Sequence, residues 1–292
     1  MASDNPVSSS SAVERSGSTA GGATSISPAP LPQLRAALAG LTAPVSAICF
    51  VTAVIATVLW LAARPSTWST AVRDVFARQV YFTGVGALVI TCVGGLMVGI
   101  SVIAQAGVWL ARLDQSALFG PIVATVVIQN LGPLLVNFFV IGRSGTAITT
   151  ELANMAVHHE VEVLDGQGVD PFVYLVLPRV IGVAVSVLCL TILFVMVAVL
   201  GGWLFGVALQ VPALAGPQFL HGILLSMGPI DMLAFFGKAF VPGLVTGAVC
   251  CVYGLRVEPV LTAVPQAGTR AVVAAVAALF VLSGLISMVA LI

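Results

Sequence analysis

The sequence predicts an all-α, polytopic membrane protein, and both its composition and the length of its apolar runs support this fold class. Hydrophobic residues make up 59% of the chain and charged residues only 8%, whereas a soluble domain carries about 25% charged residues. A helix that spans the hydrocarbon core needs about 20 apolar residues. Stretches without Asp, Glu, Lys or Arg occur at 36–63, 79–111, 115–142, 180–230 and 271–292. The formal net charge is zero, so we expect no attraction to nucleic acid.

The beginning of the chain differs in character from the rest. Residues 1–35 are rich in Ser, Ala, Gly and Pro, which is typical of a disordered tail, and residues 36–292 form the expected transmembrane domain. The first apolar run, around 44–63, could span the membrane or lie within one leaflet. Residues 69–82 place apolar and charged side chains on opposite helical faces, which predicts an interfacial helix.

Five membrane spans are expected after this helix. The run 180–230 is too long for one span, and its second half contains Pro212, Pro217 and Pro229, so residues 209–231 are expected to be largely non-helical or re-entrant. The expected spans cover about 84–110, 118–150, 172–208, 232–256 and 270–291.

The distribution of Lys and Arg predicts the orientation. If the segments before the first span, around 151–171 and around 256–270 are all cytoplasmic, only Arg112 lies on the outer side. Because cytoplasmic loops are enriched in Lys and Arg, we expect a cytoplasmic N-terminus and an external C-terminus.

Glycine pairs at four-residue spacing recur in the spans, and such pairs allow helices to approach closely. We expect these pairs to pack helices within one subunit in preference to forming a contact between two subunits. The pairs are Gly95/Gly99, Gly202/Gly206 and Gly243/Gly247.

The most polar part of the expected transmembrane domain is residues 143–179. Within it, residues 153–168 have the pattern of a short amphipathic helix that ends at Gly166 and Gly168. Asp170 and Pro171 match the N-cap and the first residue of the next span. The residue pattern alone leaves two interpretations equally open, a docking surface for a soluble partner and a merely solvated loop.

This polar stretch also contains a histidine and acidic cluster, which does not match a zinc site. The cluster consists of His158, His159, Glu160 and Glu162. The HExxH motif needs a second histidine at position 163, where this chain has Val163. The sequence has no GxxxxGK[ST] loop, so any ATP must bind to another chain. An intramembrane enzyme is disfavoured, because no nucleophile–base pair or metal set is apparent.

Two charged residues, Asp231 and Lys238, fall at the beginning of the fourth span and inside it. Charges within a span are rare and usually face protein or a water-filled cavity. Lys238 could contact an anionic headgroup; alternatively, it could snorkel or form a structural ion pair.

A series of motifs carries a resemblance to the MlaE/YrbE permease family, which supplies the membrane subunit of Mla- and MCE-type ABC lipid transporters. The resemblance covers about residues 70–290. The motifs are Leu131-Gly132-Pro133, Gly142-Arg143-Ser144-Gly145-Thr146-Ala147, Glu151, Met155, Gly168-Val169-Asp170-Pro171 and Pro178-Arg179. Asp231, Lys238 and Tyr253-Gly254 also resemble the family's fourth span.

The resemblance implies a non-catalytic permease of the bacterial inner membrane. It implies a homodimer bound to two cytoplasmic ATPases, which hold ATP and Mg, and to a periplasmic ring of MCE-domain subunits, with a small accessory subunit as a further expected partner. Lipid would occupy a cavity at the dimer interface. The candidates for lining it are Gln129, Asn130, Leu131, Asp231 and Lys238.

The same resemblance implies that the polar segment is a coupling helix seated in the ATPase. The candidate coupling residues are Glu151, Met155, His158, His159, Glu160, Glu162, Asp165 and Asp170. The residues of the structural motif are Gly142, Arg143, Gly145, Gly168, Pro171 and Arg179.

Two departures from the family pattern bear on function. Family members often carry Arg-Glu where this chain has Gln129-Asn130, and an acidic residue where it has His159. The loss of two charges near the expected cavity leaves the headgroup preference open. The sequence also does not specify which lipid is carried or in which direction. The alternative function is a secondary transporter or channel for a hydrophobic small molecule. Such proteins often contain repeated halves, and the sequence shows no internal repeat.

Overall fold

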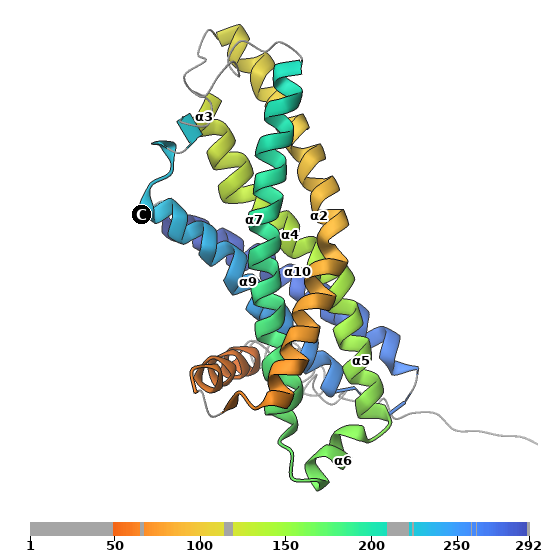
Figure 1. The fold of residues 1–292 in the computed structure, drawn as a ribbon. Helices are drawn as coiled ribbons and strands as arrows, with labels where there is room; N and C mark the ends of the chain where they lie inside the picture. Colours follow the sequence, from red (N-terminus) through yellow and green to blue (C-terminus); the bar gives the residue numbers. More distant parts are fainter. Residues whose placement is uncertain are drawn as a thin grey trace, which may run out of the picture. The chain divides into compact units, whose positions relative to one another are not determined.

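The computed structural model contains helices and no strand among the residues it describes (Figure 1). The described residues are 49–64, 67–113, 119–208, 222–223, 225–257, 259–260 and 262–290. Five helical stretches are long and apolar enough to cross a membrane: Thr70–Leu110, Gly120–Val157, Phe172–Ala208, Pro229–Leu255 and Ala263–Ala290. The prediction of five spans in an all-α fold is therefore confirmed. The predicted tail 1–35 and most of the segment 209–231 lie outside the described residues.

The longest helix, α2 (Thr70–Leu113), corrects one sequence prediction. Residues 69–82 do not form a separate interfacial helix, because α2 runs unbroken for 44 residues. At 1.5 Å per residue it is about 66 Å long, more than twice the hydrocarbon thickness of about 30 Å. Val72 and Gln79 in its first turns are buried, while Arg73 and Arg78 are exposed. The amphipathic pattern was real, but it marks the first turns of a helix too long for the membrane.

A short apolar helix, Cys49–Ala62, precedes α2. It lies across the lower part of the bundle rather than along it (Figure 1). Val54 and Val58 on one side belong to the buried core, whereas Leu59 and Trp60 are exposed. This arrangement favours the alternative in which the first apolar run lies within one leaflet.

The second span is one helical path interrupted by two π-helical segments. It consists of α3 (Phe119–Val123), a π-helical segment Ala124–Leu131, α4 (Gly132–Val140), a second π-helical segment Ile141–Gly145 and α5 (Thr146–Val157). The third span begins with a π-helical segment, Phe172–Val176, and continues as α7 (Leu177–Ala208). Single π turns inside helices frequently occur at functional sites.

Glycines set the distance between the long helices, as the sequence predicted. A Cβ on Gly99 of α2 would collide with the backbone of Ala198 in α7, and one on Gly202 would come within 2.7 Å of the Gly99 carbonyl oxygen. In α9 (Pro229–Leu255), a Cβ on Gly247 would lie 2.9 Å from the Cα of Val180. These glycines therefore pack helices within one chain.

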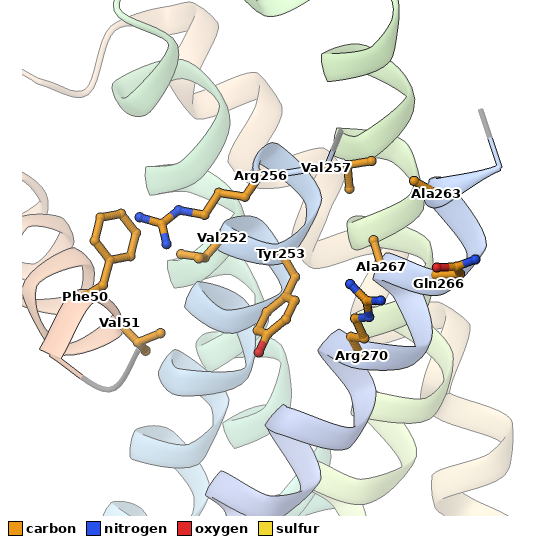
Figure 2. A pocket seen from close by; sticks show the side chains of 10 residues that line it. All are labelled: Phe50, Val51, Val252, Tyr253, Arg256, Val257, Ala263, Gln266, Ala267 and Arg270. Carbon is orange, nitrogen blue, oxygen red and sulfur yellow. The ribbon is translucent and has the colours of Figure 1, made fainter. Parts of the chain in front are cut away.

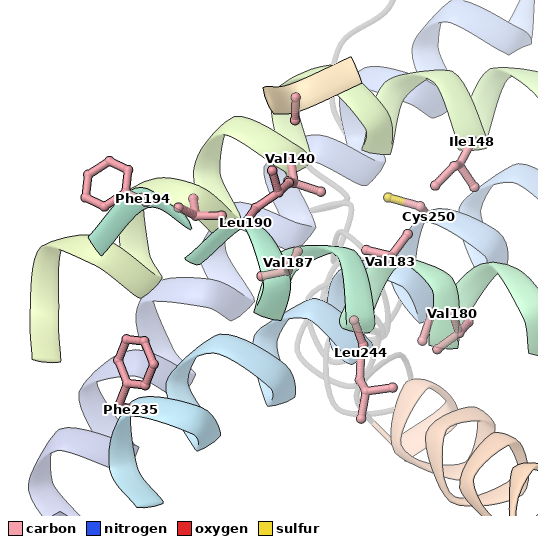
Figure 3. Close-up of a cluster of buried hydrophobic side chains, with 14 of the residues drawn as sticks. Val140, Ile148, Val180, Val183, Val187, Leu190, Phe194, Phe235, Leu244 and Cys250 are labelled. Atoms are coloured by element: carbon pink, nitrogen blue, oxygen red, sulfur yellow. The ribbon is translucent and has the colours of Figure 1, made fainter. Parts of the chain in front are cut away.

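The core lies where α4, α5, α7 and α9 meet. Figure 3 shows buried side chains from these helices converging, among them Val140, Ile148, Val187 and Leu244. The last helix, α10 (Ala263–Ala290), contributes less to it and leaves a long apolar face exposed. This face includes Val273, Phe280, Val281, Leu285, Met288 and Val289. An exposed apolar face on a membrane span is suited to contact lipid or another span.

Candidate functional site

Lys238 is held inside the bundle by neutral acceptors from the second span. Its ammonium group is 3.1 Å from the carbonyl oxygen of Gln129 and 3.0 Å from the side-chain oxygen of Asn130. Proline has no amide hydrogen, so Pro133 donates no backbone hydrogen bond where the π-helical segment Ala124–Leu131 gives way to α4. The ammonium of Lys238 donates to the Gln129 carbonyl beside this interruption.

A second contact between the same two spans works in the opposite direction. Pro242 in α9 cannot donate to the carbonyl four residues earlier, which is that of Lys238 itself. The side-chain amide of Asn137 donates to this carbonyl at 3.4 Å and to the Pro133 carbonyl at 2.8 Å. Neighbouring side chains thus donate to carbonyls at both places where the prolines interrupt the helical hydrogen bonds. We call Gln129, Asn130, Asn137 and Lys238 the proline clamp.

The proline clamp contains a positive charge but no acidic side chain. Lys238 is only 5% exposed, and none of the described residues forms an ion pair with it. The carboxylate of Asp231 lies at the beginning of α9, where it accepts a hydrogen bond from the Gly228 amide at 2.9 Å. Of the predicted cavity residues, the structure therefore brings Gln129, Asn130 and Lys238 into contact and gives Asp231 a helix-capping contact.

Asn137 is the residue of the proline clamp that was not predicted from the sequence. Its side-chain nitrogen makes both contacts, while its side-chain oxygen is buried without a hydrogen-bond partner among the described residues. The signal available in the sequence was the presence of Pro133 and Pro242 inside two spans, because each proline interrupts the backbone hydrogen bonds of its helix.

The basal end of the bundle, where α6 (Glu160–Gly166), the first turn of α2 and the α9–α10 junction lie, holds a second polar contact (Figure 1). The Arg179 guanidinium in α7 is 2.7 Å from the Glu151 carboxylate in α5. The Arg179 side chain is 7% exposed and that of Glu151 is 58% exposed. The ion pair connects α5, which leads into α6, with the beginning of α7.

The predicted amphipathic helix 153–168 is wrong as a single helix. Residues 153–157 end α5, the chain turns at His158 and His159, and α6 then begins at Glu160. The His158 ring turns back to the Asn154 carbonyl, with its Nδ1 atom 2.8 Å away. His159 has a left-handed φ of 57°, which a regular right-handed helix does not allow. Helical periodicity continues across such a corner and cannot reveal it.

The end of α6 agrees with the sequence prediction. Gly168 has a φ of 79°, its amide donates to the Asp165 carbonyl at 2.9 Å, and the Val169 amide donates to the Leu164 carbonyl at 3.2 Å. This pattern is a Schellman cap, which favours glycine at its left-handed position. Asp170 then accepts a hydrogen bond from the Phe172 amide at 2.9 Å, as expected of an N-cap before Pro171.

None of the α6 residues is buried in this chain. Glu160, Glu162 and Asp165 are exposed, and so is the apolar side chain of Val163, which is 58% exposed. The Met155 side chain instead packs against the core from α5. The geometry presents a short charged helix on a fixed support at one end of a transmembrane bundle.

The corner between α5 and α6 provides a first testable prediction. We expect His159→Gly to be neutral or slightly stabilising, because glycine adopts a left-handed φ without the cost of about 1 kcal/mol that other residues incur. His159→Val should destabilise the corner, since a β-branched residue tolerates this φ poorly. Thermal unfolding of the purified protein compares them, and equal melting temperatures for both variants would contradict the prediction.

The motif residues Gly142, Arg143 and Gly145 lie where α5 begins. The Arg143 guanidinium donates to the Phe82 carbonyl at 3.3 Å, and a Cβ on Gly86 would collide with it. A Cβ on Gly145 would lie 3.2 Å from the Cys250 sulfur, whereas Gly142 has open space around it. Arg143 and Gly145 therefore position the second span against α2 and α9.

Comparison with known proteins agrees with this arrangement. The profile described as Permease MlaE matches residues 76–289, well over half of the chain. A probable ABC transporter permease of Rickettsia conorii is 29% identical over 67% of this chain and 75% of its own length. The intermembrane phospholipid transport system permease protein MlaE of Haemophilus influenzae is 31% identical over 44% of this chain and 50% of its own length. The chloroplast protein TRIGALACTOSYLDIACYLGLYCEROL 1 of Arabidopsis thaliana is 24% identical over 70% and 58%.

An ABC transporter permease is the non-catalytic, multi-pass membrane subunit, and this role implies an ATPase partner. The extent of the profile match decides the family: this chain belongs to the MlaE permease family of ABC transporters.

Proposed function

We propose that this permease moves phospholipids or related lipids between the bacterial inner membrane and a periplasmic MCE-domain partner. The Haemophilus influenzae relative is named for intermembrane phospholipid transport. The observation that supports the proposal best is α6, an exposed charged helix between two spans whose support is held by the Glu151–Arg179 ion pair. This is a suitable shape for a helix that transmits movement from an ATPase to the spans.

The proposed assembly is a homodimer with two ATPases on the basal side, and ATP and Mg bind to the ATPases. Arg64, Arg73, Arg78, Arg256 and Arg270 belong to the basal elements. Since Lys and Arg favour the cytoplasmic side, the basal end is the cytoplasmic one. The N-terminus then lies in the cytoplasm and the opposite end of the bundle faces the MCE ring.

Copurification tests this assignment directly. A tagged full-length chain should bring down an ABC ATPase and an MCE-domain protein from its native membrane. Recovery of the intact permease with neither protein would refute the proposed assembly. Mass spectrometry of lipids retained by the complex would identify the transported class.

The proline clamp leads to a second prediction. In the proposed cavity, Lys238 is the one charge of the clamp and is the candidate to attract an anionic headgroup. We expect Lys238→Ala to lower bound lipid and transport about tenfold or more, because a hydrogen bond from a charged group is worth about 1.5–3 kcal/mol. Lipid content of the purified complex and transport in proteoliposomes measure this effect.

Asn137→Leu is the matched control for Lys238→Ala. It removes the other contact of the clamp and leaves the positive charge in place. If the charge attracts lipid, Asn137→Leu retains bound lipid even where it lowers thermal stability. Unchanged lipid content and transport in Lys238→Ala would exclude the headgroup role.

A further inference from the structure

A pocket at the basal end lies away from the proline clamp and from α6. Its volume is about 390 Å³. Three elements enclose it: the helix Cys49–Ala62, the last turns of α9 with the residues that follow, and the first turns of α10 (Figure 2). The pocket therefore joins the short first helix to the two final spans.

Two arginines give the pocket its positive charge. Arg256 follows the last turn of α9 and Arg270 belongs to α10, and both side chains are exposed. None of the described lining residues is acidic, and no described carboxylate forms an ion pair with either arginine. Like charges from two helices on one pocket favour binding of an anion.

The position of Arg256 leaves hydrogen-bond donors available. Its guanidinium carbon lies 3.8 Å from the ring centroid of Phe50, and Figure 2 shows the side chain extending toward that ring. Stacking uses the face of the guanidinium, whereas the N–H groups point outward in its plane. The stack therefore fixes the group while its donors remain free to meet oxygen atoms, and Arg is the side chain best suited to phosphate.

Most of the other lining residues are apolar, which indicates a lipid rather than a small soluble anion. Val51, Val252 and Ala267 line the pocket beside the two arginines, with Tyr253 and Gln266 as further polar groups. Two positive charges beside apolar side chains suit a lipid whose phosphate meets the arginines while its acyl chains begin along the apolar wall.

We infer that this pocket binds the phosphate of an anionic phospholipid from the surrounding leaflet, with Arg256 and Arg270 as its ligands. Basic pockets between membrane helices are suited to such headgroups. The bound lipid joins the helix Cys49–Ala62 to α9 and α10. It is separate from any transported lipid, so the inference does not depend on the proposed direction or cargo.

Native mass spectrometry of the full-length protein in neutral detergent tests the inference. The protein is titrated separately with phosphatidylglycerol and with phosphatidylcholine. We expect preferential binding of phosphatidylglycerol, and an affinity about tenfold lower in Arg256→Gln and in Arg270→Gln. Arg256→Lys and Arg270→Lys keep the charge and should retain most of the preference.

Three controls distinguish a specific lipid site from diffuse surface attraction, from loss of folding and from binding of a free anion. Arg73→Gln removes an exposed arginine of the basal end outside the pocket and should leave the preference intact. Phe50→Leu removes the stacking partner of Arg256 but keeps both positive charges. Both Phe50→Leu and Arg256→Gln lose the stack, but only Arg256→Gln loses a charge, so comparing them separates loss of folding from loss of lipid binding. Inorganic phosphate at equal concentration should not displace the lipid.

Each contrary result overturns the inference. Equal binding of phosphatidylglycerol by wild type and by the Arg256→Gln/Arg270→Gln double variant would exclude the two ligands. An equal loss in Arg73→Gln would indicate diffuse surface attraction instead of a site. Full competition by inorganic phosphate would show that the pocket recognises the free anion and not a lipid.

Discussion

Replacing Gly99 with valine is expected to abolish recovery of folded permease. The position has no room for a side chain, since even a Cβ would collide with the backbone carbonyl of Ala198. A flexible side chain could move aside, but this neighbour is the backbone of α7, and a Cβ on Gly202 of the same helix would likewise come within 2.7 Å of the Gly99 carbonyl oxygen. Adding atoms to a well-packed core costs about 1–3 kcal/mol or more. Valine should force α2 and α7 apart along their contact.

Gly284→Val is the matched control, because a Cβ at Gly284 in α10 meets nothing within 4 Å. Both variants make the same chemical change in a membrane span. Size-exclusion profiles after detergent extraction should show monodisperse protein for Gly284→Val and aggregate for Gly99→Val. Gly99→Ala should be intermediate, with a lower melting temperature. If Gly99→Val and Gly284→Val gave equal yields and melting temperatures, the packing argument would be wrong.

The spans were predictable from sequence because bilayer thickness fixes the length of an apolar run. Every predicted span overlaps an observed one, and the cap at Gly168 and Asp170 followed from residue type. The extent of α2 was not predictable in this way. Its first turns look amphipathic because they extend past the apolar stretch, and periodicity gives the face of a helix without showing whether it joins the next one.

The polar contacts were predictable in part. A charge within an apolar span indicated that Lys238 has a special environment. Its partners are separated from it by 109 and 108 residues in the chain, and no local pattern specifies which helices face each other. Likewise, the corner at His159 depends on a single backbone angle. The family could be identified from the sequence because the spacing and the residue identity of several motifs agree with it. Hydropathy alone identifies membrane spans but not a family.

Among changes at the basal end, Glu151→Ala is expected to be more damaging than removal of both members of the ion pair. The variant leaves the nearly buried Arg179 guanidinium with a long contact of 3.5 Å to the Leu175 carbonyl. A buried charge without its partner is costly. Glu151 is half-exposed, so solvent reduces the loss, and we expect about 1–3 kcal/mol. Arg179→Met should cost less, because water can solvate the remaining carboxylate.

The single variant Glu151→Ala leaves the Arg179 charge nearly buried without its partner. The double variant Glu151→Ala/Arg179→Met removes this charge too, so its melting temperature should lie above that of Glu151→Ala. The comparison forms a double-mutant cycle, which isolates the interaction between neighbouring groups. Glu162→Ala on exposed α6 is the control and should change stability by less than about 0.5 kcal/mol. In the assembled transporter, Glu151→Ala should also uncouple ATP hydrolysis from transport, because the ion pair supports the helix that carries α6. Additive effects of the two substitutions would show that the pair holds no shared energy and that α6 is supported by packing alone.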